Sequence, residues 1–198
     1  MKVFEFEQGS PEWHSIRAGR PTASNFDMLV TSKGEVSKQR TKYLYRLAGE
    51  RITGMPEDSY QTLAMIRGNE VEAEAREFYE LLRGPVRQVG FCLDDSDSYG
   101  ASPDGLIGDD GCLEIKCPNL STHVGYLIEE KLPTEYFQQV QGQLLVTGMK
   151  WSDFVSYFPG MKPLIIRVER DEGFIESLKS ELIEFCSELE HIVRNLSK

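Results

Sequence analysis

The sequence predicts an α+β fold in a single domain (residues 1–198), with helices packed around one central mixed β-sheet. Segments with helical periodicity alternate with short strand-like runs that are separated by Asp, Ser and Gly turns. Their order is helices, three consecutive strands, a helix, two strands and a final helix, which is typical of an α+β domain. A chain of 198 residues suffices for one domain with a proper core but is short for two.

The first half of the chain contains two predicted helices and then three predicted strands. Residues 40–53 are expected to form a helix that Gly54 ends, and residues 62–82 repeat apolar side chains at helical spacing. The period then changes to that of strands. The strands are expected at residues 86–93, 99–107 and 112–117.

The second half returns to helical periodicity over residues 133–148, where a proline stands near the start and a glycine near the end. Residues 153–158 and 164–169 are expected to be strands around a turn that contains proline and glycine. Residues 173–196 carry apolar side chains on one stripe, which predicts an amphipathic helix.

Composition excludes several classes of protein. An apolar content of 40% and a charged content of 27% are those of an ordinary globular protein, and no apolar run approaches the roughly 18 residues of a membrane span. The first residues do not resemble a secretion signal, so we expect a cytoplasmic protein without a membrane partner. The cysteines show no C-x-x-C spacing, which argues against zinc and iron–sulfur sites. They are Cys92, Cys112, Cys117 and Cys186.

The formal net charge of −10 argues, taken alone, against a nucleic-acid partner. The basic residues are unevenly distributed, however, because the segment from Lys33 to Arg51 holds six bases and two acids. Such a segment can meet phosphate, since the local field governs the encounter. The alternative is an ordinary solvated helix face. The bases are Lys33, Lys38, Arg40, Lys42, Arg46 and Arg51.

The sequence S-P-D-G at residues 102–105, followed by L-E-I-K at residues 113–116, is the main candidate for chemistry. Side chains alternate along a strand, so Glu114 and Lys116 should share one face. The turn upstream can bring the Asp104 carboxylate beside Glu114. Two converging carboxylates repel unless a cation lies between them, and oxygen ligands favour Mg²⁺ or Mn²⁺. With a lysine, they form a minimal apparatus for metal-assisted phosphodiester hydrolysis. The alternative is a surface hairpin with ordinary charges.

Two predicted helices supply further candidates. Glu72 lies at the edge of the apolar face of its helix, from which a carboxylate can point inward to a metal. Gln141 lies within an apolar stripe of residues 133–148, and a buried amide needs hydrogen-bond partners, for which the acidic cluster is the natural place. A satisfied core amide remains an equal alternative for Gln141.

The order Glu72, S-P-D-G, L-E-I-K-C-P and Q-V-Q resembles the PD-(D/E)xK nuclease superfamily. More closely, the chain resembles the phage lambda exonuclease and YqaJ-type viral recombinase nucleases, which share the pattern W-H-x-x-R-x-G-x-x-T-A-S found from Trp13 to Ser24. The resemblance covers about Glu12 to Arg170 and implies a restriction-endonuclease-like core. The chain departs from the phage enzyme in being shorter, with almost no C-terminal extension.

The resemblance implies roles for the residues of the predicted metal site. Asp104, Glu114 and the carbonyl oxygen of Ile115 would bind metal, with two ions expected per site and Glu72 completing or supporting the site. Lys116 would position the attacking water, and Gln141 would hold the lysine or the water.

The resemblance also implies contacts to DNA. Arg17 matches the arginine that binds a 5′-terminal phosphate, which suits its planar fork of donors, and Ser24 and Ser102 match the hydroxyls that help it. Met65 matches an apolar wedge that splits the end base pair, with a core methionine as the alternative. Lys33, Lys38, Arg40 and Lys42 would face DNA in the channel of a ring.

The function implied is a Mg²⁺-dependent exonuclease that degrades one strand of linear double-stranded DNA from its 5′ end. It would leave 3′ overhangs for recombination, act as a homotrimeric ring of phage or prophage type, and work with a single-strand annealing recombinase. One alternative is another nuclease of the superfamily, such as a site-specific endonuclease or a helicase-associated nuclease with an iron–sulfur cluster. The other is a catalytically inactive protein that binds DNA ends. The four cysteines lack the spacing of iron–sulfur ligands, which disfavours the helicase-associated nuclease, and intact Asp104, Glu114 and Lys116 disfavour the inactive protein.

Overall fold

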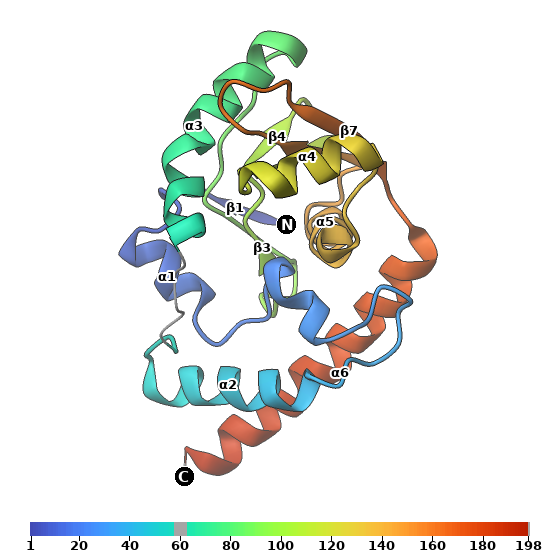
Figure 1. Cartoon of the computed structure of the whole chain (residues 1–198). Helices are drawn as coiled ribbons and strands as arrows, with labels where there is room; N and C mark the ends of the chain where they lie inside the picture. Colours follow the sequence, from blue (N-terminus) through green and yellow to red (C-terminus); the bar gives the residue numbers. More distant parts are fainter. Residues whose placement is uncertain (58–62, 198) are drawn as a thin grey trace.

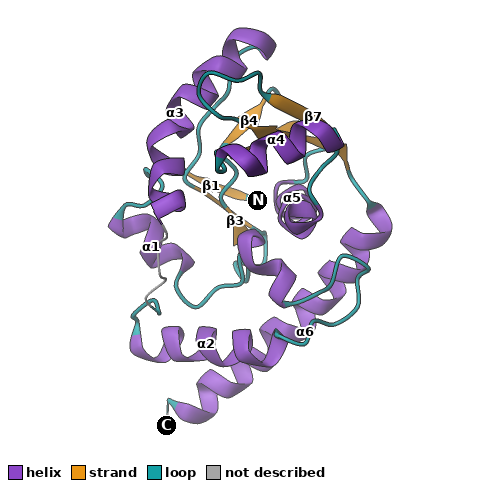
Figure 2. Ribbon diagram, viewed as in Figure 1, coloured by secondary structure: helices purple, strands orange, loops and turns teal. Residues whose placement is uncertain are grey.

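The computed structural model describes residues 1–57 and 63–197, with the side chains of all of these except residues 63–69. It has an α+β architecture in which helices surround two small sheets (Figures 1 and 2). The elements are β1 (Lys2–Phe4), α1 (Pro11–Arg17), the 3-10 helix η1 (Ala23–Met28), α2 (Arg40–Thr53), α3 (Leu63–Arg83), β2 (Phe91–Leu93), β3 (Gly100–Ala101), β4 (Gly105–Ile107), β5 (Gly111–Lys116), α4 (Leu120–Glu129), the 3-10 helix η2 (Thr134–Tyr136), α5 (Phe137–Thr147), β6 (Trp151–Ser156), β7 (Leu164–Glu169) and α6 (Glu172–Leu196).

A mixed sheet is present, as predicted, but the strands are divided between two sheets instead of one. The four-stranded sheet has the order β4-β5-β6-β7, with β5 and β6 parallel and the other pairs antiparallel. The strands β1, β2 and β3 form a separate antiparallel sheet. The expected strand at residues 99–107 is therefore two strands in different sheets. Pro103 has no N–H for a ladder, and the Asp104 N–H already donates to Leu113 O of β5 at 3.0 Å, so the chain passes from one sheet to the other between Ala101 and Asp104.

The helices pack around these sheets in the way that their apolar faces dictate. Helix α2 packs against α6, and α5 packs against η1 and α6, around one large apolar core. Helix α3 packs against β5 over a second apolar cluster that contains Ala75, Tyr79, Leu113 and Ile115. Figure 1 shows α2 and α6 crossing at the side of the molecule away from the four-stranded sheet. Among the described residues, no helix has the length and apolarity that crossing a membrane requires.

Helices α1 and α4 and the 3-10 helix η1 were not predicted from the sequence. No residue of α1 is buried, so the helix has no apolar stripe to reveal it. Its start is fixed locally, because the Ser10 side chain accepts a hydrogen bond from the Trp13 N–H at 3.2 Å and Pro11 occupies the first turn.

Arg40, whose contact with DNA remains a prediction, is already engaged by acidic residues of the same chain. Its guanidinium forms ion pairs with Glu181 and, at 2.8 Å, with Glu188, both on α6. Arg51, further along α2, pairs with Glu190 of α6 in the same way. These arginines therefore join α2 to α6. The three lysines of the basic segment are exposed, and their contact with DNA remains a prediction; they are Lys33, Lys38 and Lys42.

Gly142 allows α5 to approach η1 closely. A Cβ atom on Gly142 would lie 2.4 Å from Cδ2 of Phe26, which is fully buried, and 3.3 Å from the Cβ of Ala23. The absence of a side chain at Gly142 thus sets the distance between α5 and η1, the 3-10 helix that carries Ser24.

We expect Gly142→Ala to destabilise the protein, because overpacking of about 1–3 kcal/mol exceeds the roughly 0.5–1 kcal/mol that alanine gains over glycine within a helix. Gly125→Ala in α4 is the matched control, since no atom lies within 4 Å of the added Cβ. It should be neutral or slightly stabilising. Urea unfolding of both variants measures the difference, and equal stability of the two would contradict this account of Gly142.

Candidate active site

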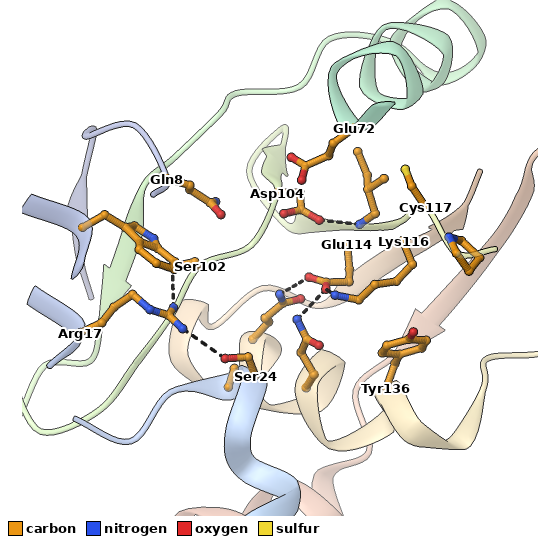
Figure 3. A pocket seen from close by; sticks show the side chains of 16 residues that line it. Gln8, Arg17, Ser24, Glu72, Ser102, Asp104, Glu114, Lys116, Cys117 and Tyr136 are labelled. Atoms are coloured by element: carbon orange, nitrogen blue, oxygen red, sulfur yellow. Dashed lines mark hydrogen bonds and ion pairs between the residues drawn. The ribbon is translucent and has the colours of Figure 1, made fainter. Parts of the chain in front are cut away.

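A cavity of about 420 Å³ lies where α1, η1, α3, β5 and α5 meet (Figure 3). It gathers most of the candidate residues that the sequence indicated, from segments far apart in the chain. Its lining includes Gln8, Trp13, Arg17, Ser24, Glu72, Ser102, Asp104, Glu114, Ile115, Lys116, Tyr136, Gln139 and Gln143.

Asp104 and Glu114 are both buried in the wall of this cavity, with 9% and 1% of their surface exposed. Asp104 precedes β4, and its Oδ2 atom accepts a hydrogen bond from the Ile115 N–H at 2.6 Å. Burial and the neighbouring charges of Glu114 and Glu72 raise the pKa of Asp104 well above its usual value. The ionised carboxylates of the site repel each other, and little solvent is present to screen them. A bound cation would offset this repulsion.

Lys116 shares the face of β5 that carries Glu114, as the strand alternation predicted. Its Nζ atom lies 2.6 Å from Glu114 Oε1 and 5.2 Å from the centre of the Tyr136 ring. Burial lowers the pKa of Lys116, but the charges of Glu114 and Asp104 outweigh burial and raise it. The opposite face of β5 carries Leu113 and Ile115, which pack against α3.

The prediction that Gln141 holds the lysine or a water is wrong. Gln141 is buried on another side of α5, where its Nε2 donates to Glu169 O and its Oε1 accepts from the Asp171 N–H, both at 2.9 Å. Two other glutamines of α5, which no sequence pattern indicated, face the site instead. Gln139 Nε2 donates to Glu114 Oε1, and Gln143 Nε2 donates to Glu114 Oε2. They lie four residues apart and so share a helix face.

Glu72 comes from α3 and lines the same cavity as Asp104, with 32% of its side chain exposed. Figure 3 shows its carboxylate on the side of the cavity where Asp104 lies. Its Oε1 atom pairs with Arg76 at 2.6 Å, one turn further along the helix. Met65 also belongs to α3, but its side chain lies outside the described residues. The wedge role of Met65 therefore remains a prediction.

Arg17, Ser24 and Ser102 converge at the other end of the cavity, as the resemblance implied. Arg17 Nη1 donates to Ser102 Oγ at 3.0 Å, and Nη2 donates to Ser24 Oγ at 3.2 Å. The guanidinium lies 4.0 Å from the centre of the Trp13 ring. Burial lowers the pKa of Arg17 to about 10, which still leaves it cationic at neutral pH.

The partners of Arg17 leave its charge uncompensated, because among the described residues no carboxylate forms an ion pair with it. Ser102 Oγ also accepts a hydrogen bond from Trp13 Nε1 at 2.9 Å. Since the Ser102 oxygen accepts from both Trp13 and Arg17, its own proton is available to an acceptor in the cavity. A partly buried cation flanked by hydroxyl groups is a suitable cradle for an anion such as phosphate.

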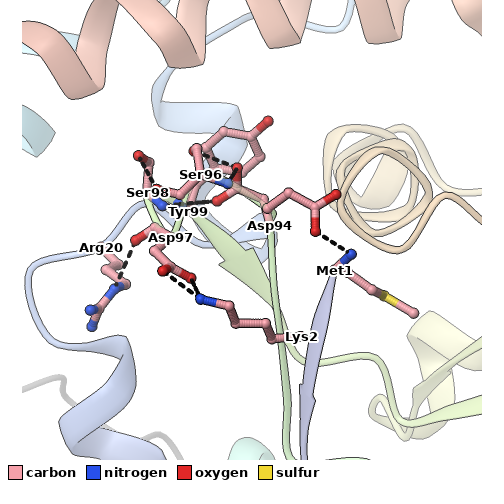
Figure 4. A network of polar contacts seen from close by, with 9 residues as sticks. Met1, Lys2, Arg20, Asp94, Ser96, Asp97, Ser98 and Tyr99 are labelled. Carbon is pink, nitrogen blue, oxygen red and sulfur yellow. Dashed lines mark hydrogen bonds and ion pairs between the residues drawn. The ribbon is translucent and has the colours of Figure 1, made fainter.

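The backbone around Ser102 is held by polar contacts on both sides. Gln8 Nε2 donates to the carbonyl oxygen of Pro103 at 3.0 Å. On the other side, Asp94 accepts hydrogen bonds from the N–H groups of Ser98 and Tyr99 at 2.8 and 3.0 Å (Figure 4). These contacts fix the turn between β2 and β3, and so the strand that leads to Ser102.

The donor set of the site fits a small divalent cation. Among the residues whose side chains are described, no group of three or more His, Cys, Asp or Glu side chains could by itself hold a metal ion. Mg²⁺ does not require such a group, because it commonly binds one or two carboxylates and keeps several waters. Asp104 and Glu114 supply two carboxylates, and Ile115, which lines the cavity beside them, supplies a backbone carbonyl.

Comparisons with known proteins identify the family of this chain. Residues 12–150 match the YqaJ-like viral recombinase domain. The alkaline exonuclease LHK-Exo from Laribacter hongkongensis is 37% identical, with a TM-score of 0.85 over 94% of this chain and 96% of that one. Its complex with dAMP gives 36% identity and a TM-score of 0.84 over the same shares.

A phage-related exonuclease from Haemophilus somnus 129PT shares the fold, with a TM-score of 0.72 over 90% of this chain and 96% of that one, at 13% identity. No match was found among curated protein sequences. The match over residues 12–150 and the similarity to LHK-Exo, together with a cavity that joins Asp104, Glu114 and Lys116, show that the chain belongs to the lambda exonuclease and YqaJ-like viral recombinase family.

Proposed function

We propose that this chain is a Mg²⁺-dependent exonuclease, for which Mn²⁺ can substitute, that removes nucleotides from the 5′ end of one strand of linear double-stranded DNA. The observation that carries the proposal is a single cavity with an anion cradle at one end and a carboxylate–lysine cluster at the other. A terminal phosphate bound by Arg17 would place the first phosphodiester of the same strand toward Asp104 and Glu114. This arrangement favours attack from a 5′ end over internal cleavage.

Each residue of the cluster has a role that its contacts support. Asp104, Glu114 and the carbonyl oxygen of Ile115 would hold the metal, with Glu72 supporting one of two ions. Metal ions in such a site lower the pKa of bound water and offset charge on the phosphate. Lys116 would orient the attacking water or stabilise the developing negative charge. Gln139 donates to the same oxygen of Glu114 that Lys116 contacts, so it takes the orienting role expected of Gln141.

The wider proposal concerns assembly and partners. A homotrimeric ring would concentrate positive potential in a central channel and leave acidic surfaces outside, which reconciles a net charge of −10 with a DNA substrate. Exposed Lys33, Lys38 and Lys42 are the cations of the basic segment that remain for such a channel. The 3′ overhangs would serve a single-strand annealing recombinase encoded by a phage or prophage.

We expect Lys116→Ala to reduce cleavage by about 10²–10³-fold, the usual loss when a donor that stabilises charge in the transition state is removed. Asp104→Ala should abolish cleavage, because no described neighbour can replace a buried ligand. Release of nucleotides from linear duplex DNA measures both, in Mg²⁺ and with EDTA.

Asp110→Ala is the control for these variants, since Asp110 is a carboxylate on the turn between β4 and β5 that pairs with exposed Lys150. It should retain full activity. Turnover by Asp104→Ala at the wild-type rate in Mg²⁺, or cleavage that EDTA leaves unchanged, would refute the metal site.

Arg17→Ala should slow digestion of 5′-phosphorylated ends by about ten- to a hundredfold, because a charge-assisted hydrogen bond contributes roughly 1.5–3 kcal/mol. Digestion of 5′-hydroxyl ends should be slowed far less. The comparison uses duplexes that differ only in the terminal phosphate.

Arg20→Ala is the matched control, because Arg20 donates to the carbonyl oxygen of Ile16 and does not line the cavity. Its rates on the two substrates should keep the wild-type ratio. An equal loss by Arg17→Ala on both substrates would mean that Arg17 does not recognise the terminal phosphate.

A further inference from the structure

We propose that Gln143 is a positioning residue, which orients the Glu114 carboxylate so that its Oε2 atom binds the divalent metal. The inference rests on the proposed metal-dependent function and deepens it, because it names the residue that prepares a metal ligand. The inference is based on the hydrogen bond that Gln143 Nε2 donates to Glu114 Oε2 in the wall of the cavity.

The orientation of the Gln143 amide is fixed by its partner. Gln143 has no exposed surface, and only the NH₂ group of an amide can donate to a carboxylate. Its Oε1 atom is then left without a hydrogen-bond partner among the described residues. Buried acceptors normally have partners, so this atom marks a place where the site takes up a donor. A water bound to a metal ion is such a donor.

The contacts of Glu114 distinguish its two oxygens. Oε1 accepts from Gln139 and lies 2.6 Å from the Lys116 ammonium. Oε2 accepts from Gln143. A carboxylate offers about two lone pairs on each oxygen, so the described partners saturate Oε1 and leave one lone pair on Oε2. The free metal-binding position is therefore on the oxygen that Gln143 holds.

A glutamine suits this position better than a charged residue does. A lysine or arginine would neutralise the Glu114 charge that attracts the metal, and a glutamate would add a second buried negative charge beside it. The neutral amide fixes the carboxylate without reducing its charge. Hydrogen bonds of this kind to metal ligands typically change metal affinity by about ten- to a hundredfold.

The test is Mn²⁺ binding to the whole protein without DNA, measured by isothermal titration calorimetry. Gln143→Met, which keeps the length of the side chain but removes the donor, should weaken Mn²⁺ binding by about ten- to a hundredfold. Gln143→His retains an N–H donor and should recover most of the affinity. Cleavage by Gln143→Met should approach the wild-type rate when Mn²⁺ is raised in proportion.

Gln141→Met is the matched control, because Gln141 is a similarly buried glutamine two residues away whose hydrogen-bond partners among the described residues are all backbone atoms. It should bind Mn²⁺ as the wild type does, even if it unfolds at a lower temperature. Affinity of Gln143→Met within twofold of Gln141→Met would overturn the inference. If Gln143→Met does not fold, Gln143→Asn, which withdraws the donor, replaces it under the same criterion. Absence of Mn²⁺ binding to the wild type would instead refute the proposed metal site.

Discussion

The burial of two carboxylates in one cavity is the constraint on which the site depends. Asp104 and Glu114 lie close enough for the charge of Glu114 to raise the pKa of Asp104, and both are almost fully removed from solvent. Such a pair is costly unless each oxygen has partners. The surrounding elements supply them: β5 gives the Ile115 N–H and Lys116, and α5 gives two amides. Antiparallel pairing of β4 with β5 brings the two acids together, since Gly105 lies opposite Leu113.

Positive and negative charges are concentrated at opposite ends of the cavity. The carboxylates lie beside Lys116 at one end, and Arg17 lies with the hydroxyls of Ser24 and Ser102 at the other. These short-range fields decide what the cavity can hold, whereas the net charge of −10 describes mainly the outer surface. A solved alkaline exonuclease from Laribacter hongkongensis is 37% identical to this chain.

Much of the fold could be predicted because local patterns decide it. The bounds of α2 and β7 agree with those expected, and the alternation along β5 placed Glu114 and Lys116 correctly. The sequence could not show that Gln139 and Gln143, and not Gln141, face the site. Helix α5 is buried on nearly all sides, so the periodicity of its apolar residues does not distinguish its faces. Likewise, the charge of Arg40 did not reveal that Glu181 and Glu188, about 140 residues later, would pair with it. The orientation of the glutamines and the partners of Arg40 both depend on contacts between distant parts of the chain.

The most direct test of the account is the anomalous scattering of Mn²⁺ in crystals of this protein, at a concentration that supports cleavage of DNA. The account predicts an anomalous peak bonded to carboxylate oxygens of both Asp104 and Glu114. Two negative charges that face one buried cavity repel each other, and a divalent cation bound between them offsets that repulsion. A crystal that holds Mn²⁺ only elsewhere, with none bound to Asp104 or Glu114 under conditions of full activity, would contradict the account.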